Sequence, residues 1–101
     1  MSSASASDLT RCRERIDSLD LQLLEVLNER TAIVEEIGRI KQELRLAIYE
    51  PKREDQVFAN VLAQNHGPLP HDAVQRIFER IIDEMRNVQK LKMVDNDPAK
   101  H

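Results

Sequence analysis

The chain has 101 residues, a formal net charge of -3, one cysteine and no tryptophan. This length suits a single domain, and the acidic balance argues against a nucleic-acid binder, although a local cationic cluster could still hold a small anion. The lone Cys12 excludes an internal disulfide, so a cytoplasmic setting is expected. The N-terminus lacks the features of a secretory signal, and no apolar run reaches membrane-spanning length, so neither nucleic acid nor a membrane is expected as a partner.

The first predicted element is a long helix from about Leu9 to Leu44. Seam positions recur along it in alternating steps of three and four. They are Leu9, Cys12, Ile16, Leu19, Leu23, Val26, Arg30, Ile33, Ile37, Ile40 and Leu44, all apolar except Arg30. This heptad pattern is typical of a helix that packs along its whole length. Ser7 or Asp8 could cap its N-terminus.

Two shorter helices are predicted after it. Pro51 favours the first turn of the second helix, and residues 65–67 (Asn-His-Gly) end it. The third helix begins near His71, and its apolar stripe ends at Gln89. All three predicted elements are helical, so the sequence predicts an all-α fold with one long, one short and one medium helix.

The apolar seam of the long helix is too long for its two companions to cover, since it extends for about 55 Å at the ordinary helical rise. The uncovered part would leave a large apolar patch in water, so a second copy of the chain is expected to cover it. We therefore expect an entwined helical homodimer. Residues 9–93 form its domain, between a flexible N-terminus at 1–8 and a flexible tail at 94–101.

Three polar residues interrupt these apolar patterns. Arg30 occupies a core position of the heptad seam, and Lys41 lies about three turns further along nearly the same face. Such a pair either packs as snorkelling or ion-paired side chains or holds a ligand such as a dicarboxylate, and spacing leaves both interpretations open. Gln89, taken alone, is more typical of a structural residue than of a functional one, because a glutamine is common at the edge of a stripe near a helix end.

Other kinds of site are not supported by the sequence. His66 and His71 flank a Gly-Pro-Leu-Pro loop, but no histidine, cysteine or carboxylate cluster has the spacing of metal ligands. No nucleophile triad and no glycine-rich phosphate loop is present. No metal is therefore expected.

Four motifs, in chain order, resemble those of the all-helical chorismate mutase family. They are Arg13-x-x-Ile16-Asp17-x-Leu19-Asp20 with Leu23-Leu24-x-x-Leu27-x-x-Arg30; Ile37-Gly38-x-x-Lys41; Ile48-Tyr49-Glu50-Pro51-x-Arg53-Glu54; and Gly67-Pro68-Leu69-Pro70 followed by Ile77-Phe78-x-x-Ile81-Ile82 and Gln89. The resemblance covers residues 9–90. It implies three helices per chain in an entwined dimer with two active sites.

The resemblance also implies roles for the polar residues that contact the ether and the carboxylates. Arg30 and Arg13 look like the two carboxylate-binding arginines, with Arg13 supplied by the second chain. Lys41 looks like the cation that contacts a carboxylate and the breaking ether oxygen, and Gln89 looks like the second donor to that oxygen. Because 28 residues, or about 42 Å of helix, separate Arg13 from Lys41, one ligand can meet both only if two chains pair antiparallel.

Four further positions are assigned through the resemblance. Glu54 looks like the acceptor for the ring hydroxyl, beside Arg53. Glu50 stands where the family often has aspartate. Met85 stands where many relatives have a serine near a substrate carboxylate, and this departure removes one hydrogen bond.

The implied activity is the intramolecular rearrangement of chorismate to prephenate in phenylalanine and tyrosine biosynthesis, without a cofactor. An isochorismate-pyruvate lyase of the same fold and a non-catalytic helical dimerisation module are the alternatives. The combination of Glu54 and Gln89 favours the mutase. Association with a larger shikimate-pathway enzyme, or origin as a piece of one, stays open.

Overall fold

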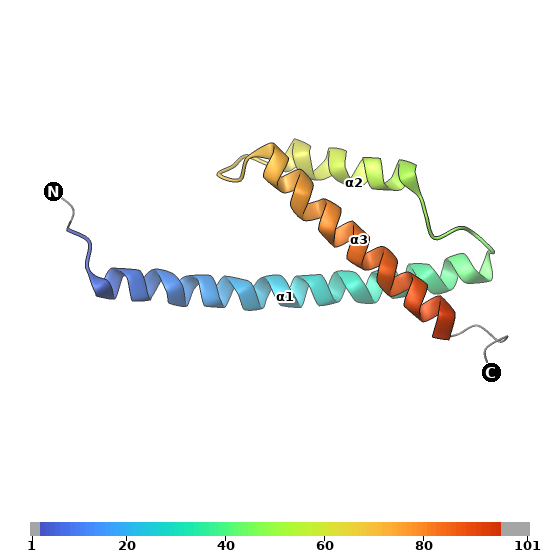
Figure 1. The fold of residues 1–101 in the computed structure, drawn as a ribbon, viewed down its shortest axis with the longest axis horizontal. Coiled ribbons are helices and arrows are strands. Elements are labelled where there is room, and N and C mark those ends of the chain that lie inside the picture. Colours follow the sequence, from blue (N-terminus) through green and yellow to red (C-terminus); the bar gives the residue numbers. More distant parts are fainter. Residues whose placement is uncertain (1–2, 96–101) are drawn as a thin grey trace. The chain divides into compact units, whose positions relative to one another are not determined.

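The computed structural model describes residues 3–95, which contain three α-helices (Figure 1). The helices are α1 (Ala6–Glu43), α2 (Pro51–Gln64) and α3 (His71–Asp95). The predicted all-α fold with one long, one short and one medium helix is confirmed. Within the described residues, no helix is both long enough and apolar enough to cross a membrane.

The chain divides into two units, residues 1–32 and residues 33–101. The first unit holds most of α1, and the second holds the last residues of α1 together with α2 and α3. The tail predicted for residues 94–101 lies mostly outside the described residues. Its first two residues, Val94 and Asp95, are the last residues of α3.

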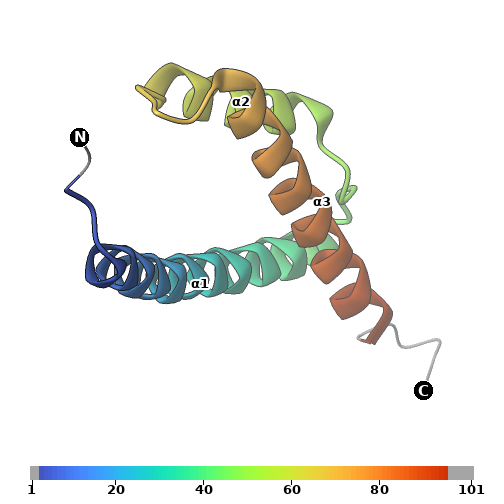
Figure 2. The same ribbon diagram turned by 60° about the vertical axis from the view of Figure 1, so that its left-hand side comes forward.

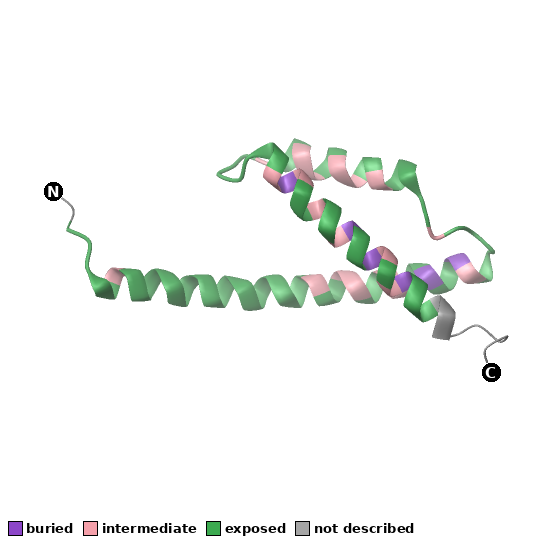
Figure 3. Cartoon of the chain, viewed as in Figure 1, coloured by how far each residue is buried: buried purple, intermediate pink, exposed green. Residues whose placement is uncertain are grey.

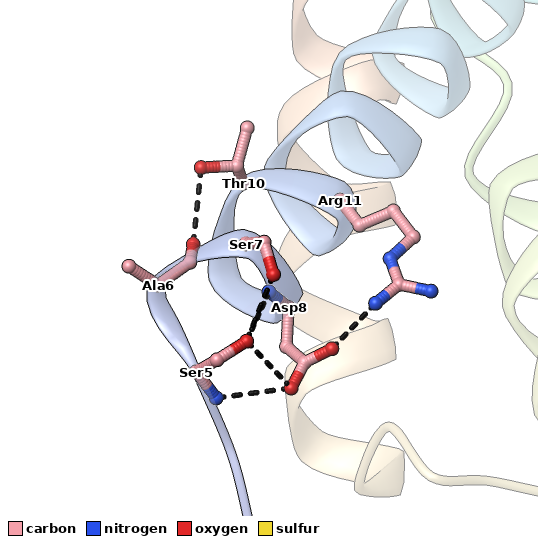
Figure 4. Close-up of polar contacts among 6 residues, drawn as sticks. All are labelled: Ser5, Ala6, Ser7, Asp8, Thr10 and Arg11. Atoms are coloured by element: carbon pink, nitrogen blue, oxygen red, sulfur yellow. Dashed lines mark hydrogen bonds and ion pairs between the residues drawn. The ribbon is translucent and has the colours of Figure 1, made fainter.

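A reciprocal pair of hydrogen bonds closes the first turn of α1 (Figure 4). The backbone nitrogen of Asp8 donates to Ser5 Oγ over 3.3 Å, and the backbone nitrogen of Ser5 donates to Asp8 Oδ2 over 2.9 Å. This is a capping box, with Ser5 as the N-cap. The predicted cap at Ser7 or Asp8 was wrong, because Ser5 has the acidic residue three positions further on. The helix thus begins inside the N-terminus predicted to be flexible, residues 1–8, of which residues 1–2 lie outside the described part.

The apolar seam of α1 is open to solvent within the first unit. Ile16, Leu19 and Leu23 are each more than half exposed. None of the described residues of this unit is buried (Figure 3). An apolar row that is exposed to water is energetically unfavourable.

A Schellman motif ends α1 after Glu43. The backbone nitrogen of Leu46 donates to the carbonyl of Lys41 over 2.7 Å, and that of Arg45 donates to the carbonyl of Gln42 over 3.2 Å. Arg45 has a φ of 57°, in the left-handed region where glycine is usual. This residue reverses the chain and directs the connection to α2 back toward the last turn of α1.

The ends of α2 follow the sequence prediction. Pro51 occupies the first turn, and the helix stops at Gln64. Beyond it, Asn65 Nδ2 donates to the carbonyl of Leu69 over 2.9 Å, and the nitrogen of Gly67 donates to Asn65 Oδ1 over 3.1 Å. Gly67 has a φ of 80°, which a residue without a side chain adopts most readily. These bonds hold the short loop that leads into α3.

The core of the second unit lies along one face of α3. Val74, Ile82 and Met85 are its buried apolar residues, spaced as one helical stripe. α2 packs against α3 as the other arm of a helical hairpin (Figures 1 and 2). Gln89 continues the stripe and is also buried, so α3 carries a buried polar group next to its apolar core.

Candidate active site

Lys41 is a buried cation at the end of α1, with 7% of its surface exposed. Its Nζ donates to the carbonyl of Ile48 over 2.9 Å and lies 2.5 Å from Glu50 Oε1. The chain reversal at Arg45 brings both partners to the lysine. An ammonium group has three N–H donors, and these two contacts use two of them. The third is available for another acceptor.

Gln89 reaches from α3 to the backbone of α1. Its Nε2 donates to the carbonyl of Val34 over 3.1 Å, and the residue is 7% exposed. A β-carbon built on Gly38 would lie 3.4 Å from Gln89 Cγ, so the missing side chain of this glycine permits the close approach. The amide nitrogen carries two N–H groups, and the bond to Val34 uses one of them.

Lys41 lies on the face of α1 that Gln89 contacts. Val34, Gly38 and Lys41 follow one another at helical spacings of four and three, so they line one side of the helix. Gln89 contacts the first two of them, and Lys41 follows one turn later. Two buried groups, each with an N–H not used by the contacts described above, therefore gather within about two turns of one helix.

Arg86, three residues before Gln89 on α3, binds Glu54 of α2. Arg86 Nη2 donates to Glu54 Oε2 over 2.6 Å, and the two side chains are 25% and 23% exposed. Arg86 Nη1 lies 3.5 Å from Asp83 Oδ1, and the guanidinium carbon lies 5.2 Å from the centre of the Tyr49 ring. The hydrogen bond to Glu54 raises the pKa of Arg86 above its ordinary value, although burial acts in the opposite direction. Arg86 therefore stays a cation at every accessible pH.

The sequence analysis missed Arg86. The available signal was its position three residues before Gln89, which places the two side chains side by side on α3. Its Nε atom is buried and has no hydrogen-bond partner among the described residues, at a cost of about 1–3 kcal/mol. The position of the guanidinium is thus set by Glu54, Asp83 and Tyr49 rather than by full satisfaction of its donors.

Three polar contacts join the helices of the second unit pairwise, and we call them the polar triangle. They are Gln89–Val34 between α3 and α1, Arg86–Glu54 between α3 and α2, and Lys41–Glu50 between α1 and the residue before α2. Each contact includes at least one residue that the sequence assigned to a site. Lys41, Glu50, Glu54 and Gln89, four of the eight predicted site residues, therefore take part in the polar triangle, which is the candidate cluster.

The other four predicted site residues are not members of the polar triangle. Arg53 is exposed on α2 and donates to Gln56 Oε1 over 3.4 Å. Met85 is buried in the core stripe of α3. In the first unit, Arg30 is half-buried and Arg13 is exposed. The ligand-binding roles assigned to these residues stay predictions.

Metal chemistry has no support in the described side chains. Across residues 3–92, whose side chains the structure describes, histidine, cysteine, aspartate and glutamate nowhere gather in a group of three that could hold a metal ion. The cluster instead offers N–H donors and paired carboxylates. Such an arrangement can bind an anionic ligand and stabilise negative charge.

Comparison with known proteins identifies the family. The sequence model of chorismate mutase type II matches residues 12–90. A bifunctional chorismate mutase/prephenate dehydratase of Aquifex aeolicus is 33% identical over 82% of this chain, which spans 24% of that relative's length. A Thermus thermophilus chorismate mutase structure (form II) superposes with a TM-score of 0.80, at 33% identity over 81% of this chain and 93% of the other.

A Helicobacter pylori chorismate mutase, solved in complex with prephenate, also superposes with a TM-score of 0.80. It is 29% identical, over 86% of this chain and 94% of the other. The resemblance inferred from the four sequence motifs is thus confirmed by sequence and by fold. The match to the family model covers most of the helical region, and the chain belongs to the chorismate mutase type II family.

Proposed function

We propose that this chain rearranges chorismate to prephenate, with Lys41 and Gln89 at the centre of the active site. The observation that carries the proposal is the geometry of these two buried side chains. Lys41 extends from α1 and is held by Ile48 and Glu50, whereas Gln89 is held against α1 by the carbonyl of Val34. Each has an N–H beyond those contacts. The Helicobacter pylori relative that binds prephenate supports the same ligand class here.

The proposed reaction takes place within one substrate molecule, so it needs neither a nucleophile nor a cofactor. The site must hold the flexible enolpyruvyl group over the ring, which lowers the entropic part of the barrier. It must also stabilise the negative charge that grows on the ether oxygen as the C–O bond breaks. Lys41 and Gln89 would donate to that oxygen, and their existing contacts fix them before the ligand arrives.

The remaining assigned residues would bind the rest of the substrate. Arg30 and Arg13 of a second copy would hold the two carboxylates, because guanidinium groups match carboxylates in shape and charge. Glu54 would accept a hydrogen bond from the ring hydroxyl, with Arg53 beside it. Met85 offers no hydrogen bond where many relatives have serine, so the remaining donors would carry more of the binding.

Glu50 would act through Lys41. The ion pair with Glu50 and the hydrogen bond to Ile48 hold the ammonium in a buried position. A donor that is already in place needs little reorganisation as charge develops on the substrate. We therefore assign Glu50 a positioning role in addition to the ligand contact inferred from the resemblance.

The open seam of α1 supports a homodimer. Ile16, Leu19 and Leu23 expose more than half of their surface in the single chain, and a second long helix would remove these groups from water. An antiparallel pairing of the two long helices would also bring Arg13 of one copy toward Lys41 of the other. We propose an entwined dimer with two shared active sites.

Light scattering across a dilution series tests the dimer. We expect a mass of about twice the 11.7 kDa of the chain at every concentration at which the protein is folded, because burial of the exposed seam residues would stabilise the dimer. Helicity should be lost together with the dimer on further dilution. A well-folded monomer with full activity would contradict both the dimer and the shared site.

The activity is tested by the loss of chorismate absorbance when purified protein is added, with prephenate identified as the product. Isochorismate is supplied in parallel, because a lyase of the same fold would release pyruvate from it. If the protein turns over isochorismate but not chorismate, the proposed mutase activity is wrong and the lyase activity takes its place. No binding of a substrate analogue in a titration would favour a non-catalytic dimerisation module.

The cellular setting follows from the proposed reaction. Prephenate leads to phenylalanine and tyrosine, and a single free cysteine suits the cytoplasm. The Aquifex aeolicus relative is named for both chorismate mutase and prephenate dehydratase, so we propose that residues 9–93 act as a mutase domain that can associate with another enzyme of the pathway.

A further inference from the structure

Arg86 is a partly buried cation that the proposed reaction does not use directly. Its guanidinium is held on three sides, by Glu54 at 2.6 Å, by Asp83 at 3.5 Å and by the ring of Tyr49 at 5.2 Å. These three residues come from α2, α3 and the connection between α1 and α2. A surface arginine on a helix does not need such a setting, so the position of this side chain is determined by tertiary contacts.

The contact with Glu54 leaves one carboxylate oxygen for another donor. Arg86 Nη2 binds Oε2 of Glu54, and a carboxylate has two acceptor oxygens. Oε1 is therefore the oxygen that could accept a hydrogen bond from a ligand. Because Glu54 is only 23% exposed and has several rotatable bonds, a fixed cation beside it restricts where Oε1 can lie.

Arg86 itself is poorly placed to bind a substrate carboxylate. Both terminal nitrogens of its guanidinium already face protein carboxylates, Tyr49 lies against it, and its Nε is buried. An incoming carboxylate would have to displace Glu54 or Asp83. The influence of Arg86 on a ligand thus passes through Glu54.

We infer that Arg86 is a positioning residue that orients Glu54 toward the ring hydroxyl of the substrate and so determines selectivity for a hydroxylated ring. The inference rests on the proposed function, because it assumes that Glu54 meets that hydroxyl. In chorismate the hydroxyl lies across the ring from the ring carboxylate, whereas in isochorismate it is adjacent to it. A Glu54 carboxylate fixed in one place favours the first arrangement, since only one of the two hydroxyls can reach it.

The test compares chorismate with its analogue that lacks the ring hydroxyl. Arg86→Met is expected to lower kcat/KM for chorismate by about 10- to 100-fold, the effect of losing one hydrogen bond to a charged group. The analogue makes no such bond, so its kcat/KM should fall by less than about 3-fold, and the discrimination between the two substrates should largely disappear. In a Glu54→Gln background, Arg86→Met should have little further effect on chorismate turnover.

Two further variants keep the test decisive. Arg80→Met removes an exposed arginine of the same helix that pairs with Glu84 at 2.8 Å, and it should change neither rate nor discrimination. Arg86→Lys retains a charge without the planar guanidinium, so it should reduce discrimination in part. If Arg86→Met does not fold, as judged by circular dichroism at the assay temperature, Arg86→Lys still decides the question.

Unchanged discrimination in the folded Arg86 variants would overturn the inference, because the side chain would then serve only the stability of the fold. An equal loss of rate in the wild-type and Glu54→Gln backgrounds would also overturn it, since Arg86 would then act without Glu54. Wild-type protein that does not turn over chorismate would contradict the proposed function itself. The two failures are therefore distinguishable.

Discussion

Arg13→Ala and Lys41→Ala are each expected to be nearly inactive towards chorismate. Losing Lys41 removes a donor to the developing oxyanion and should lower kcat/KM by about 100- to 1000-fold, and losing Arg13 removes a carboxylate-binding cation and should lower kcat/KM by about 30-fold or more. Lys41→Ala removes the buried ammonium and leaves the carboxylate of Glu50 without its cation. Arg13→Ala removes a carboxylate ligand from the site of the other copy. Lys90→Ala and Arg11→Ala, at exposed positions of α3 and α1, are the matched controls.

A mixture of the two inactive variants should regain activity. When they are unfolded and refolded together, half of the dimers formed at random contain one chain of each kind. One of the two sites in such a heterodimer combines an intact Arg13 with an intact Lys41, so the mixture should reach about a quarter of the wild-type activity. If heterodimers are demonstrated by mass spectrometry and remain inactive, Arg13 and Lys41 do not serve one shared site.

Gln89→Glu is expected to lower kcat/KM by about 100- to 1000-fold near pH 8 and to recover activity as the pH falls. The wild-type amide donates at any ordinary pH, whereas a carboxylate has no N–H or O–H to donate and would repel negative charge on the ether oxygen. A protonated carboxyl group could donate again. The wild type should therefore show a broad pH profile, and the variant should show one that rises toward acid.

The environment of residue 89 determines the pKa of the new carboxyl group and therefore the pH at which the activity of Gln89→Glu begins to recover. The position is buried, and the carbonyl of Val34 lies 3.1 Å from the amide nitrogen, so both features and a dianionic substrate would raise the pKa of a glutamate there. Lys41 would lower it, but its charge is already paired with Glu50. We expect the raised pKa, because these three effects act against one that is already offset.

The same substitution should make folding depend on pH. A carboxyl group with a raised pKa in the folded state stabilises the fold fully below the ordinary glutamate pKa, and this contribution is lost as the pH rises to the folded value. Thermal unfolding of Gln89→Glu should thus move to lower temperature between weakly acidic and neutral pH. Gln64→Glu, at an exposed position near the end of α2, adds the same charge and should not show this trend. If Gln89→Glu keeps wild-type activity at pH 8, Gln89 is not a donor to the ether oxygen.

The sequence alone determined the helices, because their signals are local. The heptad pattern of α1, Pro51 at the start of α2 and residues 65–67 at its end each act within a few residues of the boundary that they set. The family could also be recognised from the sequence, because its motifs occur in order along one chain. The N-cap was misplaced because Ser5 and Ser7 are chemically alike, although Ser5 alone precedes the acidic Asp8 by three residues, the spacing of the capping box that the hydrogen bonds form.

The tertiary structure decided the partners within the cluster. Gln89 and Val34 are 55 residues apart and Arg86 and Glu54 are 32 apart, so helical periodicity could say which face each occupies but not what meets it. Lys41 finds its partners only because a non-glycine residue adopts a left-handed conformation after α1, which no local pattern predicts. Pairing between helices depends on how they pack and on the turns that join them, and these are properties of the whole fold.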